Sequence, residues 1–286
     1  MSKTETLDPQ HIVRVVDVET NKNLATYGRE DMAQADYVNL TANDVFRQVL
    51  IEGKNDAVAA DAIPLVGSFI PNFAGWYIEA DDFEKFNADD WTVTQAGAVG
   101  TADVLAGGIG GILSVDSGGT GASDIGVQVQ HQNVTILPAA GTQIRFGCRL
   151  KIADTIATCQ FFAGLSVLDT TIIAAGAISA TDYIGFLIDA ADAAASAIGL
   201  ELNSAAGSEE KSAAVHTAVE DTYVTLEFVL DGLTTVTPYV NGVAGTAITI
   251  TSCPIVGLAA SFVCQTEGAN DPIVSVDWYY CAQSRA

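Results

Sequence analysis

Hydrophobic and polar residues alternate along much of the chain after residue 80, and the stretch 223–242 shows this pattern most clearly. Its first half places an apolar side chain at every second position from Val224 to Leu230. A period of two is typical of a strand with one buried face. Asp231 and Gly232 follow, and Gly accepts the positive φ of a tight hairpin turn. The pattern predicts a strand that turns at these two residues, with Phe228 in the core.

A second alternating run follows the turn, with Val236, Pro238 and Val240 on one face. It ends at Asn241 and Gly242, which is another strong hairpin signal. Pro238 has no N–H to donate to a sheet, so we expect it on an edge strand or at a bulge. The stretch as a whole is predicted to be an antiparallel β-meander.

The same alternation recurs at a spacing of roughly 8–14 residues, which is typical of a β-sandwich or barrel. One of these runs places Val127 and Val129 on one face and Gln128 and Gln130 on the other. We therefore predict an all-β domain over residues 78–286, built from two antiparallel sheets packed face to face. The expected strands lie at 125–134, 142–153, 158–168, 183–188, 254–263 and 271–283.

Residues 1–77 differ from the rest and are predicted to form an N-terminal arm. One short strand is expected over 11–18. Thr41 to Asp44 resemble a helix cap, and the apolar residues from Val45 to Leu50 have helical spacing. Gly53 is a plausible stop. The arm is therefore expected to contain one short helix of about three turns, which would be marginal by itself.

The segment 63–77 contains two prolines and large apolar residues without a clear period. Such a segment does not suit a central strand, and it is too apolar to extend into water. We expect it to lie along a surface, either of its own domain or of a neighbouring subunit. The candidate interface residues are Ile63, Leu65, Phe69, Ile70, Phe73, Trp76 and Tyr77.

Charge limits the classes of partner. The chain has 12 basic and 35 acidic residues, a net charge of −23, which disfavours binding to phosphate backbones. No apolar run approaches the length of a membrane span, and the N-terminus lacks the features of a signal peptide. We expect neither a nucleic acid nor a membrane as partner.

The five cysteines show no C-x-x-C pair with metal spacing. Cys148 and Cys264 alternate in step with apolar neighbours, so we expect buried, reduced thiols that pack as small hydrophobic side chains. A disulfide between Cys253 and Cys264 is the alternative.

No catalytic, cofactor or metal site is predicted. Glu201 and Glu227 lack a second acid two residues away, which counts against a laminarinase-type glycosidase, and the chain is expected not to be an enzyme. The paired acids could bind Ca²⁺, but they are better explained as solvated loop charges; they are Asp81 and Asp82, Asp89 and Asp90, and Glu209 and Glu210. The three tryptophans could stack on sugars, but core or interface positions are the commoner explanation; they are Trp76, Trp91 and Trp278.

Residues after about 78 resemble the concanavalin A-like (laminin G-like) jelly roll. The resemblance rests on the segments FEKFNADDW, IRFGCRLKI, CQFFAGLSVLD, LEFVLDG with VTPYVNG, and VSVDWYYCAQSR. The last segment is similar to the ends of tailed-bacteriophage proteins that decorate capsids. No metal loop of the lectin type is identifiable.

This resemblance implies a structural virion protein that decorates and stabilises the outer surface of a phage capsid. Its partners would be the major capsid protein and further copies of itself, with a trimer favoured. It would be made in the host cytoplasm and reside on the capsid exterior. The alternative that the same fold implies is a glycan-binding, lectin-like module on a virion tail or fibre or on a cell surface.

Overall fold

A computed structural model describes most of residues 75–285, with gaps at 88, 98–99, 106–110, 120–124, 175–176, 190–195, 206, 208 and 269. Before residue 75 it describes the backbone of three strands. The chain separates into two compact units, Met1–Ile70 and Pro71–Ala286.

The first unit contains an antiparallel sheet with the order β2-β1-β3. Its strands are β1 (Ile12–Asp17), β2 (Lys22–Gly28) and β3 (Arg47–Glu52). The strand expected over 11–18 is confirmed by β1. The expected short helix is wrong for Arg47–Glu52, because these residues pair along β1, with Val49 opposite Val15. A run such as Val-Leu-Ile fits a helix or a strand, and pairing with a distant segment decides between them. The proposed cap and Gly53 lie outside the described residues.

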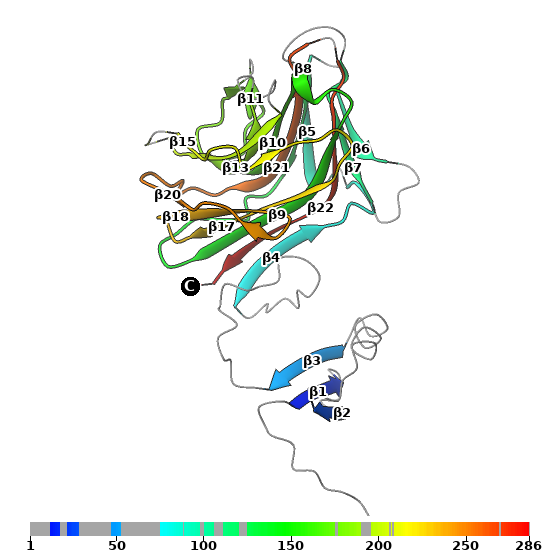
Figure 1. Cartoon of the computed structure of the whole chain (residues 1–286), viewed down its shortest axis with the longest axis vertical. Helices are drawn as coiled ribbons and strands as arrows, with labels where there is room; N and C mark the ends of the chain where they lie inside the picture. The colour runs from blue at the N-terminus through cyan, green and yellow to red at the C-terminus, as the bar shows by residue number, and fades with distance from the viewer. Residues whose placement is uncertain are drawn as a thin grey trace, which may run out of the picture. The chain divides into compact units, whose positions relative to one another are not determined.

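The second unit is a sandwich of two antiparallel sheets (Figure 1). The eight-stranded sheet has the order β15-β14-β13-β10-β21-β8-β5, with β16 also paired to β14. Its strands are β5 (Trp91–Ala96), β8 (Ile125–His131), β10 (Cys159–Ser166), β13 (Tyr183–Ile188), β14 (Ala197–Asn203), β15 (Glu210–Lys211), β16 (His216–Thr217) and β21 (Ala259–Thr266).

The nine-stranded sheet has the order β19-β18-β17-β9-β22-β7-β6, with β20 paired to β18 and β4 to β22. Its strands are β4 (Trp76–Asp81), β6 (Thr101–Val104), β7 (Leu113–Asp116), β9 (Gln143–Ala153), β17 (Val224–Asp231), β18 (Thr235–Val240), β19 (Val243–Ala244), β20 (Ile248–Thr249) and β22 (Ile273–Ser284). A small hairpin of β11 (Ile173–Ala174) and β12 (Ala177–Ile178) and a single 3-10 turn (Ile156–Thr158) complete the described elements.

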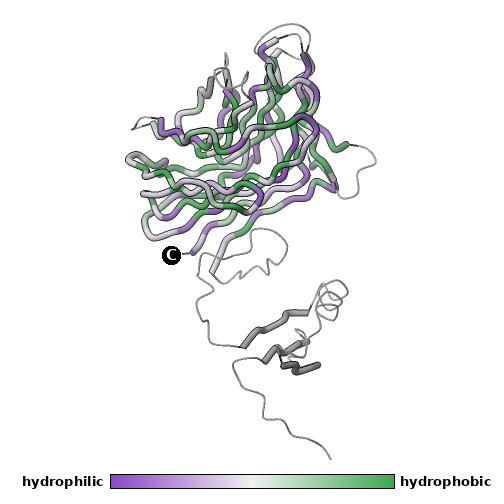
Figure 2. Tube along the Cα trace, in the orientation of Figure 1, coloured by the Kyte–Doolittle hydropathy of each residue, from purple (hydrophilic) through white to green (hydrophobic). Residues whose placement is uncertain are grey.

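The core lies between the two sheets and is built from alternate residues of each strand. Hydropathy changes from residue to residue along most strands (Figure 2), as the sequence predicts. Phe228 on β17 packs against Phe146 of its own sheet and against Phe186 of the opposite sheet, with ring centroids 5.5 and 6.1 Å apart. These contacts join the sheets face to face and confirm the predicted fold class. Cys148 and Cys264 are buried free thiols in this core, as expected.

The predicted meander is present. β17 pairs antiparallel with β18, and Gly232 takes a φ of +58° in the turn, although Asp231 is still the last residue of β17. Asn241 and Gly242 close the next hairpin with φ values of +50° and +77°. Pro238 lies on β18, and among the described strands its outer side meets only the two-residue strands β19 and β20.

The predicted boundary after residue 77 falls inside β4. Trp76 pairs with Ser284 and Tyr77 with Gln283, so both residues are part of the sandwich. The other candidate interface residues (Ile63, Leu65, Phe69, Ile70 and Phe73) lie outside the described residues.

The eight-stranded sheet is curved, and the segment that carries β11 and β12 lies in its concavity (Figure 1). We call residues 167–174 and 177–182 the strap, and the outer side of this sheet the concave face.

Candidate functional site

The concave face is lined by polar side chains from three neighbouring strands. Val127 and Val129 of β8 enter the core, so Gln128 and Gln130 face the other way. The same alternation brings further residues of β10 and β21 to this face: Gln160, Ser166, Ser261 and Gln265. These six side chains are all buried.

The two glutamines of β8 hold the strap through both ends of their amides. Gln128 donates to the carbonyl of Asp169 and accepts from the N–H of Ile172 at 2.9 Å. Gln130 donates to the carbonyl of Val167 at 2.9 Å and accepts from the N–H of Asp169 at 3.0 Å. The strap is therefore bound to the sheet by side-chain to main-chain hydrogen bonds.

Apolar side chains seal the strap against the middle of the concave face. Ile172 and Ala180 of the strap form a second hydrophobic cluster with sheet residues Phe162, Tyr183, Leu187 and Val263. The ring of Phe162 lies over a pair of glycines, Gly164 and Gly185, which face each other on β10 and β13. A Cβ on Gly185 would lie 2.5 Å from this ring. The glycines thus make room for the aromatic ring under the strap.

Two glutamines on this face keep buried amide atoms without a hydrogen-bond partner among the described residues. They are Gln160, with both its amide nitrogen and oxygen, and Gln265, with its oxygen. The two residues face each other across β10 and β21. A buried polar group without a partner costs about 1–3 kcal/mol, so each such group in a folded protein calls for an explanation.

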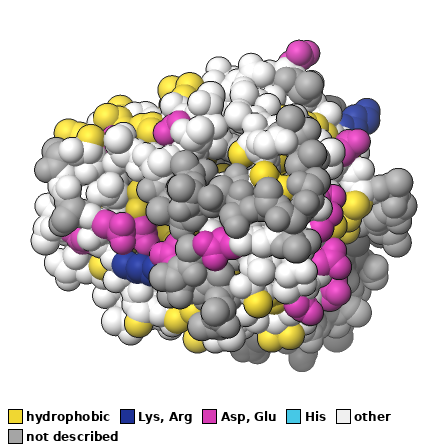
Figure 3. Space-filling model, turned by 90° about the horizontal axis from the view of Figure 1, so that it is seen from above, with side chains coloured by type: hydrophobic (Ala, Val, Ile, Leu, Met, Phe, Trp, Pro, Cys, Tyr) yellow, Lys and Arg dark blue, Asp and Glu magenta, His cyan; other side chains and the backbone are white. Residues whose placement is uncertain are grey.

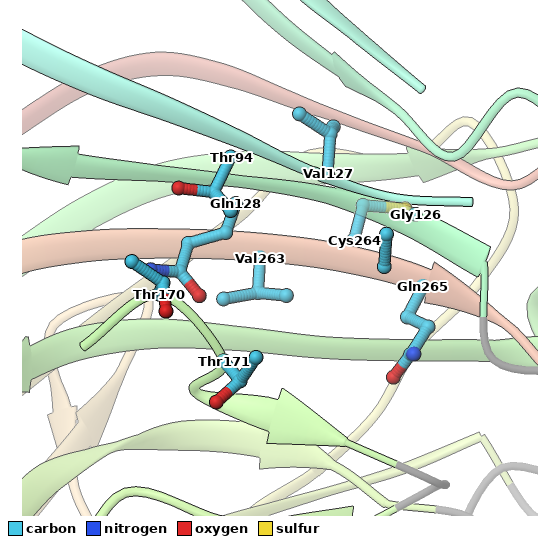
Figure 4. A pocket seen from close by; sticks show the side chains of 10 residues that line it. Thr94, Gly126, Val127, Gln128, Thr170, Thr171, Val263, Cys264 and Gln265 are labelled. Carbon is cyan, nitrogen blue, oxygen red and sulfur yellow. The ribbon is translucent and has the colours of Figure 1, made fainter. Parts of the chain in front are cut away.

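A cavity of about 30 Å³ opens beside Gln265 (Figure 4). Thr94 of β5, Gln128 of β8 and Thr170 and Thr171 of the strap also line it. Its volume is enough for about two water molecules. Apolar groups, among them Ala96, Val127 and Val263, form the rest of its wall. The cavity is thus a small space at the margin of the strap with hydroxyl and amide groups on part of its wall.

A carboxylate lies at the other end of the concave face. Glu201 on β14 is 2% exposed and accepts a hydrogen bond from the hydroxyl of Tyr183. Burial raises the pKa of Glu201 to about 7, although the hydrogen bond from Tyr183 opposes that shift. Lys211 lies 3.7 Å from Glu201 and forms a 3.0 Å ion pair with Asp189. Glu201 is thus a carboxyl group that titrates near neutral pH.

Acidic side chains are prominent around this region. The view from above (Figure 3) shows Asp and Glu gathered on both sides of the undescribed residues, with few Lys or Arg. Asp189 and Glu209 are near enough to Glu201 to raise its pKa further.

The outer face of the nine-stranded sheet carries the other candidate aromatic residues. Trp76 lies 5.6 Å from the guanidinium of Arg145, and Trp278 stacks on Tyr280. Tyr280 donates to Glu227 at 3.1 Å, and burial raises the pKa of this carboxyl group to about 7. Neither tryptophan lies on the concave face.

The third tryptophan, Trp91, lies in the hydrophobic core. Trp91 is buried and packs on Phe83, Phe262 and Tyr279. It thus occupies a core position, one of the two positions that the sequence favoured over stacking on a sugar. Over the described part of the chain, no group of three or more acidic, His or Cys residues could hold a metal ion. Within the same residues no helix is long and apolar enough to span a bilayer.

A larger cavity of about 330 Å³ lies between residues 212–215 and the hairpin of β18 and β19. Its walls are mainly apolar and include Val215, Pro238, Val240 and Val243. Its lining includes Ser212 and Thr246 but none of the buried amide groups that lack a partner, so the concave face is the better candidate for a glycan.

Sequence reasoning placed Gln128 and Gln130 on the polar face of a strand but assigned them no function. It did not single out Gln160 or Gln265. The alternation of polar and apolar residues indicates to which face of the sheet these side chains point. It does not indicate that they are buried, because the strap that covers this face comes from a distant part of the chain.

Comparisons with known proteins support the fold and leave the family open. No protein-family model matches the chain, and no curated protein sequence matches it. Among solved structures, an endo-1,3-beta-glucanase from Streptomyces sioyaensis is similar at 14% identity, with a TM-score of 0.51 and coverage of 76% of this chain and 99% of the glucanase. Peanut lectin is similar at 12% identity, with a TM-score of 0.51 and coverage of 73% and 98%.

A protein of unknown function from Shewanella oneidensis is also similar, at 12% identity, with a TM-score of 0.52 and coverage of 89% of this chain and 97% of that protein. The concanavalin A-like jelly roll is thus confirmed as the fold. None of these similarities indicates a capsid decoration protein.

The similarity to a glucanase also corrects one prediction. We expected no enzyme because Glu201 and Glu227 lack a second acid at spacing two, but endo-glucanases share this architecture. The absence of a second acid two residues from Glu201 or Glu227 therefore does not exclude enzymatic activity.

Proposed function

We propose that this protein binds glycans on the concave face of its eight-stranded sheet. The observation that carries the proposal is Gln265, whose buried amide oxygen lacks a hydrogen-bond partner among the described residues and which lines the cavity beside the strap. Gln160, whose amide also lacks a partner there, faces it from β10. A sugar hydroxyl can donate a hydrogen bond to an amide oxygen, so it would satisfy the unpartnered oxygen of Gln265. The glucanase and lectin similarities support the proposal only as analogy of fold.

A glycan array tests this proposal. Wild-type protein should bind at least one class of saccharide, and Gln265→Ala should weaken that binding about tenfold, as expected when one or two hydrogen bonds are lost. Thr237→Ala is a matched control, because Thr237 lies on β18 of the opposite sheet. An equal loss of saccharide affinity in Gln265→Ala and Thr237→Ala would contradict the proposal. So would a wild type that binds no saccharide.

Hydrolysis of a glycan is a second candidate, favoured by Glu201. A glycosidase needs a carboxyl group that is still protonated at its working pH and can act as general acid. Glu201 meets this requirement, because burial raises its pKa to about 7. Release of reducing ends from a soluble β-1,3-glucan by the wild type, and its loss in Glu201→Gln, would support an enzyme. Equal rates in both proteins would assign Glu201 a structural role.

A place on a phage capsid, with the major capsid protein and further copies of this chain as partners, stays a proposal that rests on the sequence resemblance. Glycan binding is compatible with a virion surface or with a cell surface. Co-sedimentation with purified capsids is the direct test.

A further inference from the structure

We propose that the strap restricts the concave face to the end of a saccharide chain, so that the ligand is a neutral terminal sugar and not an internal stretch of a polysaccharide. This inference rests on the proposed glycan binding and adds the class of ligand.

The strap occupies the amides that a crossing polysaccharide would need. Gln128 uses its oxygen for the N–H of Ile172 and its nitrogen for the carbonyl of Asp169. The nitrogen of Gln130 serves Val167, Ser166 and Ser261, and its oxygen accepts from Asp169. Both side chains therefore have their main hydrogen-bonding capacity filled by the protein itself.

The strap also blocks the path across the sheet. Ile172 and Ala180 pack on Phe162, Leu187 and Val263 in the middle strands, and these contacts exclude a continuous groove under the strap. The face is divided into an amide end around Gln265 and a carboxyl end around Glu201. A chain that enters at one end meets the strap before it reaches the other.

The amide end has room for one substituent of a sugar. The cavity beside Gln265 has a volume of about 30 Å³, which is too small for a pyranose ring but suits a group of two heavy atoms such as a hydroxymethyl. Thr94, Thr170 and Thr171 add hydroxyl groups around it. A terminal sugar could insert such a group while its ring stays outside.

Charge favours a neutral ligand. The protein has a net charge of −23, and Asp169 lies in the strap beside the cavity-lining residues Thr170 and Thr171. A uronic or sialic acid would meet like charge there, whereas a neutral hexose or N-acetylhexosamine would not.

The test measures how affinity depends on chain length and on free ends. Linear oligomers of glucose and of N-acetylglucosamine, from one to six units, are titrated against the full-length protein by calorimetry, together with a cyclic glucan that has no ends. For the oligomer series that binds, we expect the dissociation constant to change less than about threefold from two units to six. The cyclic glucan should bind at least tenfold more weakly.

Two variants address the strap directly. Gln128→Ala combined with Gln130→Ala removes its polar anchors, and Ile172→Ala weakens its apolar contact while both glutamines stay. Thermal melting checks that each variant folds. A folded variant should acquire an affinity that rises with chain length and should bind the cyclic glucan.

The outcomes separate this inference from the function that it rests on. If the wild type binds the cyclic glucan and gains affinity steadily with length, the chain-end inference is wrong while glycan binding stands. If the wild type binds none of the linear saccharides and nothing on the glycan array, both are wrong. Folded variants that keep the wild-type dependence on length would remove the strap as the cause of the restriction.

Discussion

At the residue scale, the decisive feature is which face of a strand a side chain takes. Val127 and Gln128 are neighbours in sequence and both buried, yet one lies in the core and the other under the strap. Alternation predicts the direction of each side chain. It does not predict burial of the polar one, because that depends on the strap, about 40 residues away along the chain.

Phe228 tests the predicted core face. It is fully buried between Phe146 and Phe186, so Phe228→Ala should lower the free energy of unfolding by about 3–5 kcal/mol. Val229→Ala is the control, because Val229 points to the opposite side of the same strand and is only half-buried. Denaturant unfolding measures both. A loss for Phe228→Ala no larger than that for Val229→Ala would reverse the assignment of faces.

Glu201 and Glu227 predict how stability depends on pH. Burial raises the pKa of each carboxyl group from 4.5 to about 7. Between these values the folded protein holds more protons than the unfolded chain, so the free energy of unfolding contributed by each group falls as the pH rises from 4.5 to 7. Glu201→Gln keeps an acceptor for Tyr183 and removes the titration. Relative to wild type, the free energy of unfolding of the variant should therefore increase as the pH rises from 4.5 to 7. Above pH 7 the difference should stay constant, and Glu227→Gln should behave in the same way. Parallel stability curves for wild type and both variants would show that neither carboxyl group titrates in this way.

At the element scale, strands with a clear hydropathy pattern, either alternating or apolar throughout, were predictable, and the assignment of the strands to two sheets was not. β13 matches the expected 183–188 because both of its faces are buried and its residues are apolar throughout. The segment that forms β3 was assigned wrongly, since its apolar spacing suits a helix as well and only its pairing with β1 decides the matter. Alternation also leaves open which strand lies beside which: β10 and β21 are adjacent in the sheet although about 95 residues separate them.

The glycine pair of β10 and β13 gives a prediction at this scale. A Cβ on Gly164 would lie 2.4 Å from both the Cα of Gly185 and the carbonyl oxygen of Ile184, which are main-chain atoms that cannot rotate away. Gly164→Ala should therefore destabilise the protein by about 1–3 kcal/mol and loosen the strap over Phe162. Gly199→Ala on β14 is the matched control, because its Cβ would meet only the flexible side chain of Lys211 at 3.3 Å. Thermal melting compares them, and equal melting temperatures would contradict the prediction.

At the scale of the whole molecule, the boundary between the two units decides how the protein can be divided. Residue 77 was the predicted boundary, because the apolar segment 63–77 has no clear period. The structure instead assigns Trp76 and Tyr77 to β4, which pairs with β22 over six residues. A chain that begins at residue 71 should keep the melting temperature of the sandwich within a few degrees. A chain that begins at residue 82 lacks β4 and should melt about 5–10 °C lower, as a loss of 2–3 kcal/mol implies for a unit of this size. If both truncations melt alike, β4 contributes little to the sandwich.

The same truncation tests whether the arm docks. The candidate contact residues Phe69 and Phe73 belong to the predicted segment, and a multivalent assembly would use such apolar anchors to hold neighbouring subunits. Removal of residues 1–70 deletes Phe69 and leaves the sandwich complete, and Phe73→Ala in the full-length chain removes the second anchor alone. If the capsid proposal holds, full-length protein should co-sediment with purified capsids, while the truncated chain should bind at least tenfold more weakly. Glycan binding should be equal in all three proteins, because the concave face lies entirely after residue 90. Full retention of capsid binding by the truncated chain would exclude the arm from the contact, and failure of the full-length chain to bind any capsid would end the virion proposal without affecting the glycan site.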